Sequence, residues 1–202
     1  MGDIFKRTSD YFTTRPPRKP VNDFESIKSL IEFPMTQSQS IRLGTAAENI
    51  LRDTISSNSK WVDIKPEIRP GEKERDHLFQ SGGVRIYAEL KSNLNLDSEK
   101  KKATREKAMY IAEQEHTQGI IVGLRHYSHE TLSQSSCTNF YKKSGLKVLP
   151  VAEYLNLFSM ENPFGSYDVY KKWLNFVALK LVEEDTDAEH LEAAETLMNL
   201  KA

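Results

Sequence analysis

The stretch from Glu74 to Lys91, ERDHLFQSGGVRIYAELK, constrains the fold of this chain more than any other. Two runs rich in strand-forming residues flank Gly82-Gly83, and a Gly-Gly pair is a favoured centre for a two-residue turn. In the second run, aliphatic residues alternate with polar or aromatic ones, which is the period of a β-strand. The sequence therefore predicts a β-hairpin that turns at the glycine pair.

The predicted pairing places two carboxylates opposite each other. A turn at the glycine pair puts Asp76 across from Glu89, with Cβ atoms about 5 Å apart. Carboxylates at this separation repel, so a sheet avoids the arrangement unless a cation lies between them. Mg²⁺ suits this position because it prefers hard oxygen ligands. The alternative interpretation is a surface hairpin with ordinary solvated charges, in which Lys91 lies opposite Glu74.

Asp76, followed after twelve residues by Glu89-Leu90-Lys91, resembles the catalytic motif of the PD-(D/E)XK nuclease superfamily, to which most type II restriction endonucleases belong. The chain departs from the name-giving pattern at Arg75, where the pattern has Pro. Two further acidic-x-Lys triplets occur, Asp63-Ile64-Lys65 and Glu99-Lys100-Lys101, but neither has an acidic residue on a paired strand. The hairpin triplet is therefore the one that matches the superfamily.

The resemblance implies a site and a reaction. The implied catalytic residues are Asp76, Glu89 and Lys91, and the implied Mg²⁺ ligands are Asp76, Glu89, the Leu90 carbonyl and Glu48. Glu48 is included because Gly44-Thr45-Ala46-Ala47-Glu48 matches a Gly-x-x-x-Glu helix that often precedes the hairpin in this superfamily. A solvated helical glutamate is the alternative. Mg²⁺ would assist phosphodiester hydrolysis, and Lys91 would position or activate the attacking water or stabilise charge at the scissile phosphate.

A basic helix is predicted over residues 98–116, directly after the hairpin. The basic residues of its first half are Lys100, Lys101, Lys102, Arg105 and Lys107. Cations near a helix N-terminus oppose the macrodipole, so DNA phosphate contact offers a reason for them, with a solvated charged face as the alternative. The resemblance also places Asn93 near a DNA backbone. The alternative for that segment is a loop and a helix cap, with Asp97 or Ser98 as the N-cap.

The rest of the chain predicts an α/β or α+β protein with a central mixed sheet flanked by helices. Helices are expected at 23–33, 43–57, within 129–143, and at 150–158, 167–183 and 187–200, and strands at 61–65, 119–124 and 146–149. From about residue 43 to 150 this order is similar to the αβββαβ core of the superfamily. The polar, proline-rich residues 1–22 are expected to form a surface arm, or a basic arm that reaches DNA.

Three regions follow from this order. They are an N-terminal arm and short helix at 1–42, a nuclease-like core at 43–160, and C-terminal helices for packing or dimerisation at 161–202. The net charge of the chain is −1, but residues 1–180 carry 27 Lys and Arg against 22 Asp and Glu, while 181–202 carry seven acids and one Lys. A mildly basic body with an acidic tail is compatible with DNA binding.

Other classes of protein are disfavoured. No run approaches the ~20 apolar residues that span a membrane, and the single cysteine, Cys137, cannot form an internal disulfide, so a cytoplasmic protein is expected. The glycine-rich motifs of nucleotide-binding proteins and the Gly-x-Ser-x-Gly of serine hydrolases are missing, so we expect no nucleotide cofactor.

The expected function is that of a type II restriction enzyme: a homodimer that cleaves double-stranded DNA at specific sequences with Mg²⁺. Two alternatives stay open at this point. One is a structure-specific or repair nuclease that uses the same site. The other is a DNA-binding or accessory protein with a non-catalytic hairpin, which would bind DNA without Mg²⁺.

Overall fold

The computed structural model describes residues 2–15, 37–92, 94–132 and 137–185. The chain forms two compact units, one of Met1–Ile50 with Pro163–Ala202 and one of Leu51–Asn162. The predicted helices at 23–33 and 187–200, the proline-rich centre of the arm and Asn93 lie outside the described residues. In the part of the chain that is described, no helix combines the length and the apolar character needed to cross a membrane.

The second unit is built on a five-stranded mixed sheet. Its strands are β1 (Val62–Asp63), β2 (His77–Ser81), β3 (Val84–Lys91), β4 (Gly119–Gly123) and β5 (Lys147–Pro150). They lie in the order β1-β2-β3-β4-β5. The first three strands are antiparallel, and β4 and β5 continue the sheet parallel to β3. The prediction of an α/β protein with a central mixed sheet is confirmed.

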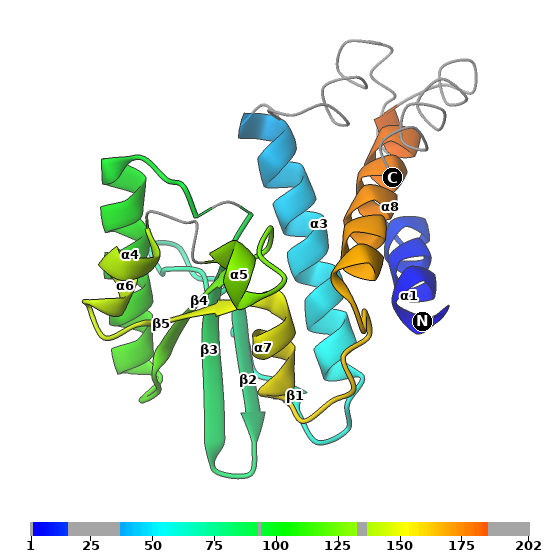
Figure 1. The fold of residues 1–202 in the computed structure, drawn as a ribbon. Coiled ribbons are helices and arrows are strands. Elements are labelled where there is room, and N and C mark those ends of the chain that lie inside the picture. Colours follow the sequence, from blue (N-terminus) through cyan, green and yellow to red (C-terminus); the bar gives the residue numbers. More distant parts are fainter. Residues whose placement is uncertain (1, 16–36, 93, 133–136, 186–202) are drawn as a thin grey trace. The chain divides into compact units, whose positions relative to one another are not determined.

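Helices cover both faces of this sheet (Figure 1). The helices of this unit are α4 (Ser98–Gln114), α5 (His129–Leu132), α6 (Thr138–Lys142) and α7 (Val151–Asn156). α4 and α6 pack on one face, and α7 packs on the other. α4 begins at Asp97, whose side chain accepts a hydrogen bond from the Lys100 amide at 2.8 Å, so the helix cap falls on one of the two predicted residues.

The hairpin has the predicted register. His77 pairs with Ala88 and Ser81 pairs with Val84, so the two strands turn at the glycine pair. Gly82 has φ +56°, a conformation that favours glycine and lets the turn close in two residues. Continued by one residue beyond β2, the same register places Asp76 opposite Glu89.

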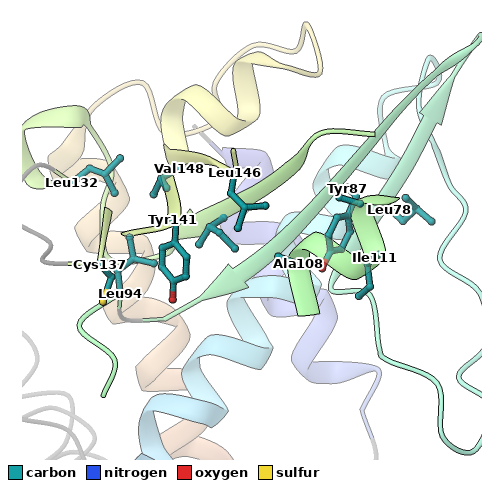
Figure 2. Packing of buried hydrophobic residues seen from close by; sticks show 12 residues of the cluster. Leu78, Tyr87, Leu94, Ala108, Ile111, Leu132, Cys137, Tyr141, Leu146 and Val148 are labelled. Carbon is teal, nitrogen blue, oxygen red and sulfur yellow. The ribbon is translucent and has the colours of Figure 1, made fainter. Parts of the chain in front are cut away.

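The core beneath α4 holds the hairpin against the helix. Leu78 and Tyr87 of the hairpin lie beside Ala108 and Ile111 of α4 in one buried cluster (Figure 2). Because side chains of a strand alternate between faces, the residues that follow Tyr87 by two and four positions also face α4. The packing of α4 on β3 therefore decides the surroundings of Glu89 and Lys91.

The first unit contains α1 (Gly2–Thr13), α8 (Tyr167–Asp185) and the first part of α3 (Gln37–Ser56), which ends in the second unit. The predicted surface arm is wrong for residues 2–13. Trp173 Nε1 of α8 donates a hydrogen bond to Thr8 Oγ1 of α1 at 2.9 Å, and both side chains are buried. The prolines prevent a helix only from their own position onward. The residues before them can therefore form a helix, and this helix packs against α8.

α3 also begins earlier than predicted, at Gln37 instead of residue 43. No Gly or Pro separates its first Gln and Ser residues from the apolar stripe that follows, so the helix extends through them. The other predicted elements of the described residues are found, with ends shifted by a few residues.

Gly119 tests how closely α4 is fitted to the sheet. A Cβ at this position would lie 2.6 Å from Leu146 Cδ2 and 3.2 Å from Ala112 Cβ. We expect Gly119→Ala to lower the free energy of unfolding by about 1–3 kcal/mol, because the methyl group overpacks the core. Urea unfolding measures this change.

Gly83→Ala is the matched control, since a Cβ at Gly83 meets no described atom within 4 Å. It should change stability by less than about 0.5 kcal/mol. Equal stability of the two variants would contradict the close fit of α4 on β4.

Candidate active site

Asp76 and Glu89 form a buried pair of carboxylates at one end of the hairpin. Asp76 directly precedes β2, and its Oδ2 accepts a hydrogen bond from the Leu90 amide at 2.8 Å. Asp76 is 7% exposed and Glu89 is 1% exposed. The interpretation as a hairpin of solvated charges is therefore wrong here. Glu74 does not face Lys91 but pairs with Lys65, at 2.9 Å.

A lysine of α4 bridges the two carboxylates. Lys107 Nζ lies 3.0 Å from Asp76 Oδ1. The same nitrogen lies 2.8 Å from Glu89 Oε1 and 2.6 Å from Glu89 Oε2. A single positively charged atom therefore contacts both acidic side chains, in the position where the sequence analysis expected a cation.

Lys91 approaches the pair from β3 itself. Its Nζ lies 2.6 Å from Glu89 Oε1 and 3.9 Å from Asp76 Oδ2. The side chain is 27% exposed, so Lys91 is partly open to solvent beside the buried pair. Tyr87, on the same face of β3, donates a hydrogen bond from its hydroxyl to Glu89 Oε2 at 3.1 Å. The structure thus brings together the three predicted catalytic residues Asp76, Glu89 and Lys91.

Burial shifts the titration of this cluster. The pKa of Glu89 is raised, first by burial and then by the charge of Asp76, while Lys91 and Lys107 oppose the shift. Burial alone would lower the pKa of Lys107, but the contacts with Glu89 and Asp76 outweigh it and the pKa is raised. The pKa of Tyr87 is raised by burial and by both carboxylates, so its hydroxyl stays a donor to Glu89.

The ends of α4 are fixed around the site. At its C-cap, Glu115 pairs with Arg75 at 2.8 Å and with Arg85 of β3 at 3.2 Å. Arg75 directly precedes Asp76 and stands where the superfamily pattern has Pro. Its ion pair with Glu115 therefore attaches this end of the hairpin to α4. At the other end the Asp97 cap secures the first turn. These contacts hold the helix that carries Lys107 against the hairpin.

The predicted DNA-binding residues of α4 lie outside the carboxylate cluster. Lys100 is more than half exposed and pairs with Asp97 at 3.2 Å. Lys101 Nζ lies 4.9 Å from the centre of the Phe140 ring, and Arg105 lies 5.2 Å from the same ring. They form a basic surface on the first half of the helix, and their contact with DNA stays a prediction. Glu48 lies on α3 in the first unit, and its part in a metal site also stays a prediction.

The bridging role of Lys107 was not predicted, because its sequence context marks it only as one more basic residue of the helix. A signal in the sequence is the spacing, because Lys107 precedes the apolar residue Ile111 by four positions. Residues at such spacings share a helix face. A lysine on the buried face of a helix usually has an acidic partner, and Asp76 and Glu89 were the two acids predicted to lie opposite each other on the hairpin.

The residues at the site fit a small divalent cation. The ammonium of Lys107 contacts both carboxylates at once, so their oxygens converge on one position. Among the described residues, no group of three or more His, Cys, Asp or Glu side chains is placed to hold a metal. A metal at the pair would therefore depend on two carboxylates, with backbone carbonyl and water completing its shell. Mg²⁺ commonly binds in this way.

No protein-family model matches the chain, and no curated protein matches it.

The raised pKa of Glu89 makes stability depend on pH. The folded chain binds this proton more tightly than the unfolded chain, so the contribution of Glu89 to stability falls as the pH rises from its unfolded pKa, 4.5, towards its folded pKa. Glu89→Gln cannot ionise, so its stability relative to the wild type should rise over that interval. Urea unfolding in EDTA from about pH 4 to about pH 8 measures the difference.

Glu74→Gln is the control, because the Glu74 side chain is 52% exposed. Its stability should follow that of the wild type across the same pH range. A Glu89→Gln variant that loses stability relative to the wild type as the pH rises would show that the pKa of Glu89 is lowered rather than raised.

Proposed function

We propose that this protein is a Mg²⁺-dependent endonuclease that hydrolyses phosphodiester bonds of double-stranded DNA. One observation carries the proposal: two buried carboxylates converge on a single cationic atom, beside a second, partly exposed lysine that contacts Glu89. Asp76, Glu89 and Lys91 occupy this arrangement in the order of the PD-(D/E)XK motif. A purely structural role would account for the ion pairs of Lys107 with Asp76 and Glu89. It gives no reason for the second ion pair, between Lys91 and Glu89.

The order of elements supports the same proposal. From α3 to β4 the chain runs helix, three antiparallel strands, helix and parallel strand. This is the αβββαβ order that the resemblance implies, with the two carboxylates at the hairpin formed by its second and third strands. We therefore propose a restriction-endonuclease-like core for the second unit and the end of α3.

The proposed mechanism gives each residue a separate task. Asp76 and Glu89 would hold Mg²⁺, and the Leu90 carbonyl is expected beside them, because the N–H and C=O of one residue in an antiparallel pair face the same neighbour. Held there, Mg²⁺ would supply Lewis-acid stabilisation of the charge at phosphorus and would make water more acidic. Lys91 Nζ is a hydrogen-bond donor on a partly exposed side chain, so we assign it orientation of the attacking water or of the scissile phosphate.

Tyr87 completes the support of the metal-binding residues. Its hydroxyl donates to Glu89 Oε2 at 3.1 Å, and its ring is fixed in the core beneath α4. A ligand held by such a contact keeps its orientation when the substrate arrives. Tyr87 therefore positions Glu89 without contacting the reacting atoms.

The DNA would lie along the solvent side of Lys91 and the basic first half of α4. Specific duplex cleavage by a homodimer, with each subunit cutting one strand, is the version of this activity that the type II restriction enzymes suggest. A structure-specific or repair nuclease would use the same residues on branched or damaged DNA. The substrate that is cleaved distinguishes the two.

Asp76→Asn and Glu89→Gln should each lower the Mg²⁺-dependent cleavage rate about 100-fold or more, because each removes a ligand whose metal supplies several kcal/mol of transition-state stabilisation. Lys91→Met should also inactivate the protein. The assay incubates purified protein with plasmid and phage DNA in Mg²⁺ or EDTA and separates the products on a gel.

Discrete fragments would indicate a sequence-specific enzyme, whereas nicking or a smear would favour the repair-type activity. Asp63→Asn and Lys65→Met are the matched controls, because they alter the neighbouring acidic-x-Lys triplet outside the carboxylate cluster. They should cleave like the wild type. Full activity in folded Asp76→Asn or Glu89→Gln would exclude the assigned site, and DNA binding without cleavage in Mg²⁺ or Mn²⁺ would favour the non-catalytic DNA-binding protein.

Replacing Lys100 and Lys101 with Gln should weaken binding to all DNA sequences and reduce the dependence of log affinity on log salt by about two, one for each lost phosphate contact. Binding is measured by fluorescence anisotropy at several salt concentrations, with Asp76→Asn present to keep the DNA intact. Lys172→Gln, exposed on α8, is the control. An unchanged salt dependence in the double variant would place the DNA elsewhere.

A further inference from the structure

Lys107 occupies the place that the proposed function assigns to a metal ion. Its nitrogen contacts Asp76 Oδ1 and both oxygens of Glu89, at 2.6–3.0 Å. Lys91 does not take this central position, since it lies 3.9 Å from Asp76 and contacts one oxygen of Glu89. Lys107 lies on α4, whereas Asp76, Glu89 and Lys91 belong to the hairpin. Its contacts with the carboxylates are therefore additional to those of the PD-(D/E)XK motif.

Charge counting shows why the lysine and a metal compete. Two ionised carboxylates are matched here by the two ammonium groups of Lys91 and Lys107. Adding a divalent cation would leave a net charge of +2 in a region where Glu89 is almost completely buried. Like charges in such surroundings repel strongly, so a metal is favoured at the pair only when an ammonium leaves it.

Lys107 is the ammonium that a metal would displace, because its nitrogen contacts both carboxylates, whereas Lys91 lies close to Glu89 alone. Both side chains are partly open to solvent, at 24% exposed for Lys107 and 27% for Lys91. The helix that carries Lys107 stays in place, because α4 is held by the Asp97 cap and by Glu115 between two arginines. Only the Lys107 side chain must rotate to free the position between the two carboxylates.

We propose that Lys107 is a positioning residue that holds the two carboxylates together in the metal-free protein and competes with the divalent metal for them. This inference rests on the proposed function, because it assumes a metal site at Asp76 and Glu89. Its consequence is that the wild-type protein binds metal weakly until Lys107 is displaced. If the displaced state makes up roughly 10% or less of the molecules, the apparent dissociation constant rises about tenfold or more.

The test measures Mn²⁺ binding by electron paramagnetic resonance without DNA, so that its readout does not depend on catalysis. Lys107→Gln should bind Mn²⁺ at least about tenfold more tightly than the wild type. Lys107→Arg keeps the charge and the contacts with carboxylates, and should bind no more tightly than the wild type. Lys102→Gln removes a charge from the exposed side of α4, where the side chain is 68% exposed, and should also resemble the wild type.

The outcomes separate this inference from the proposed function. Tight binding in Lys107→Gln that is lost when Asp76→Asn is added supports both. Equal binding in the wild type and Lys107→Gln, abolished by Asp76→Asn in each, overturns the competition and leaves the metal site intact. Binding that is unaffected by Asp76→Asn, or no binding in any variant, overturns the metal site and the competition together.

A measurement on the wild type covers the case in which Lys107→Gln does not fold. The Nζ signal of Lys107 is observed in protein with ¹⁵N-labelled lysine and assigned by its loss in Lys107→Arg. Saturating Mg²⁺ should shift this signal, or broaden it through exchange with water, and leave that of Lys102 unchanged. A Lys107 signal that stays constant while Mg²⁺ binds at Asp76 and Glu89 would overturn the proposal.

Discussion

The burial of Glu89 is the constraint on which the rest of the site depends. A carboxylate that is 1% exposed costs several kcal/mol unless cations and hydrogen bonds surround it, and here two lysines and a tyrosine do so. The second carboxylate, Asp76, makes the requirement greater, because it raises the pKa of Glu89 further. Hydrophobic side chains of similar volume would stabilise the fold as well or better at these positions, and this cost supports the proposed metal site.

The surrounding structure serves to bring these groups together. The glycine turn sets the register that places Asp76 across from Glu89, and the packing of α4 on the hairpin brings Lys107 above them. The parallel strand β4 then covers the other edge of β3. The turn, the packing of α4 and the pairing of β3 with β4 together fix the positions of Asp76, Glu89 and Lys107. This explains how a short sequence motif can form a buried site.

Much of this was predictable from the sequence, because the deciding signals are local. The alternation in β3, the glycine pair and the spacing of Asp76 from Glu89 define the hairpin and its register without reference to the rest of the chain. Lys107 was missed because its partners are known only when α4 is placed over β3. The helix at residues 2–13 was missed for a similar reason, since its buried face is completed by Trp173, far along the chain.

The most direct test of the central claim is anomalous diffraction from crystals of the protein soaked with Mn²⁺. We expect a peak between the Asp76 and Glu89 carboxylates, with Lys107 Nζ moved away from the pair. Crystals that show Lys107 still bridging the two carboxylates, with no peak beside them or with Mn²⁺ bound elsewhere, would contradict a metal site at the hairpin.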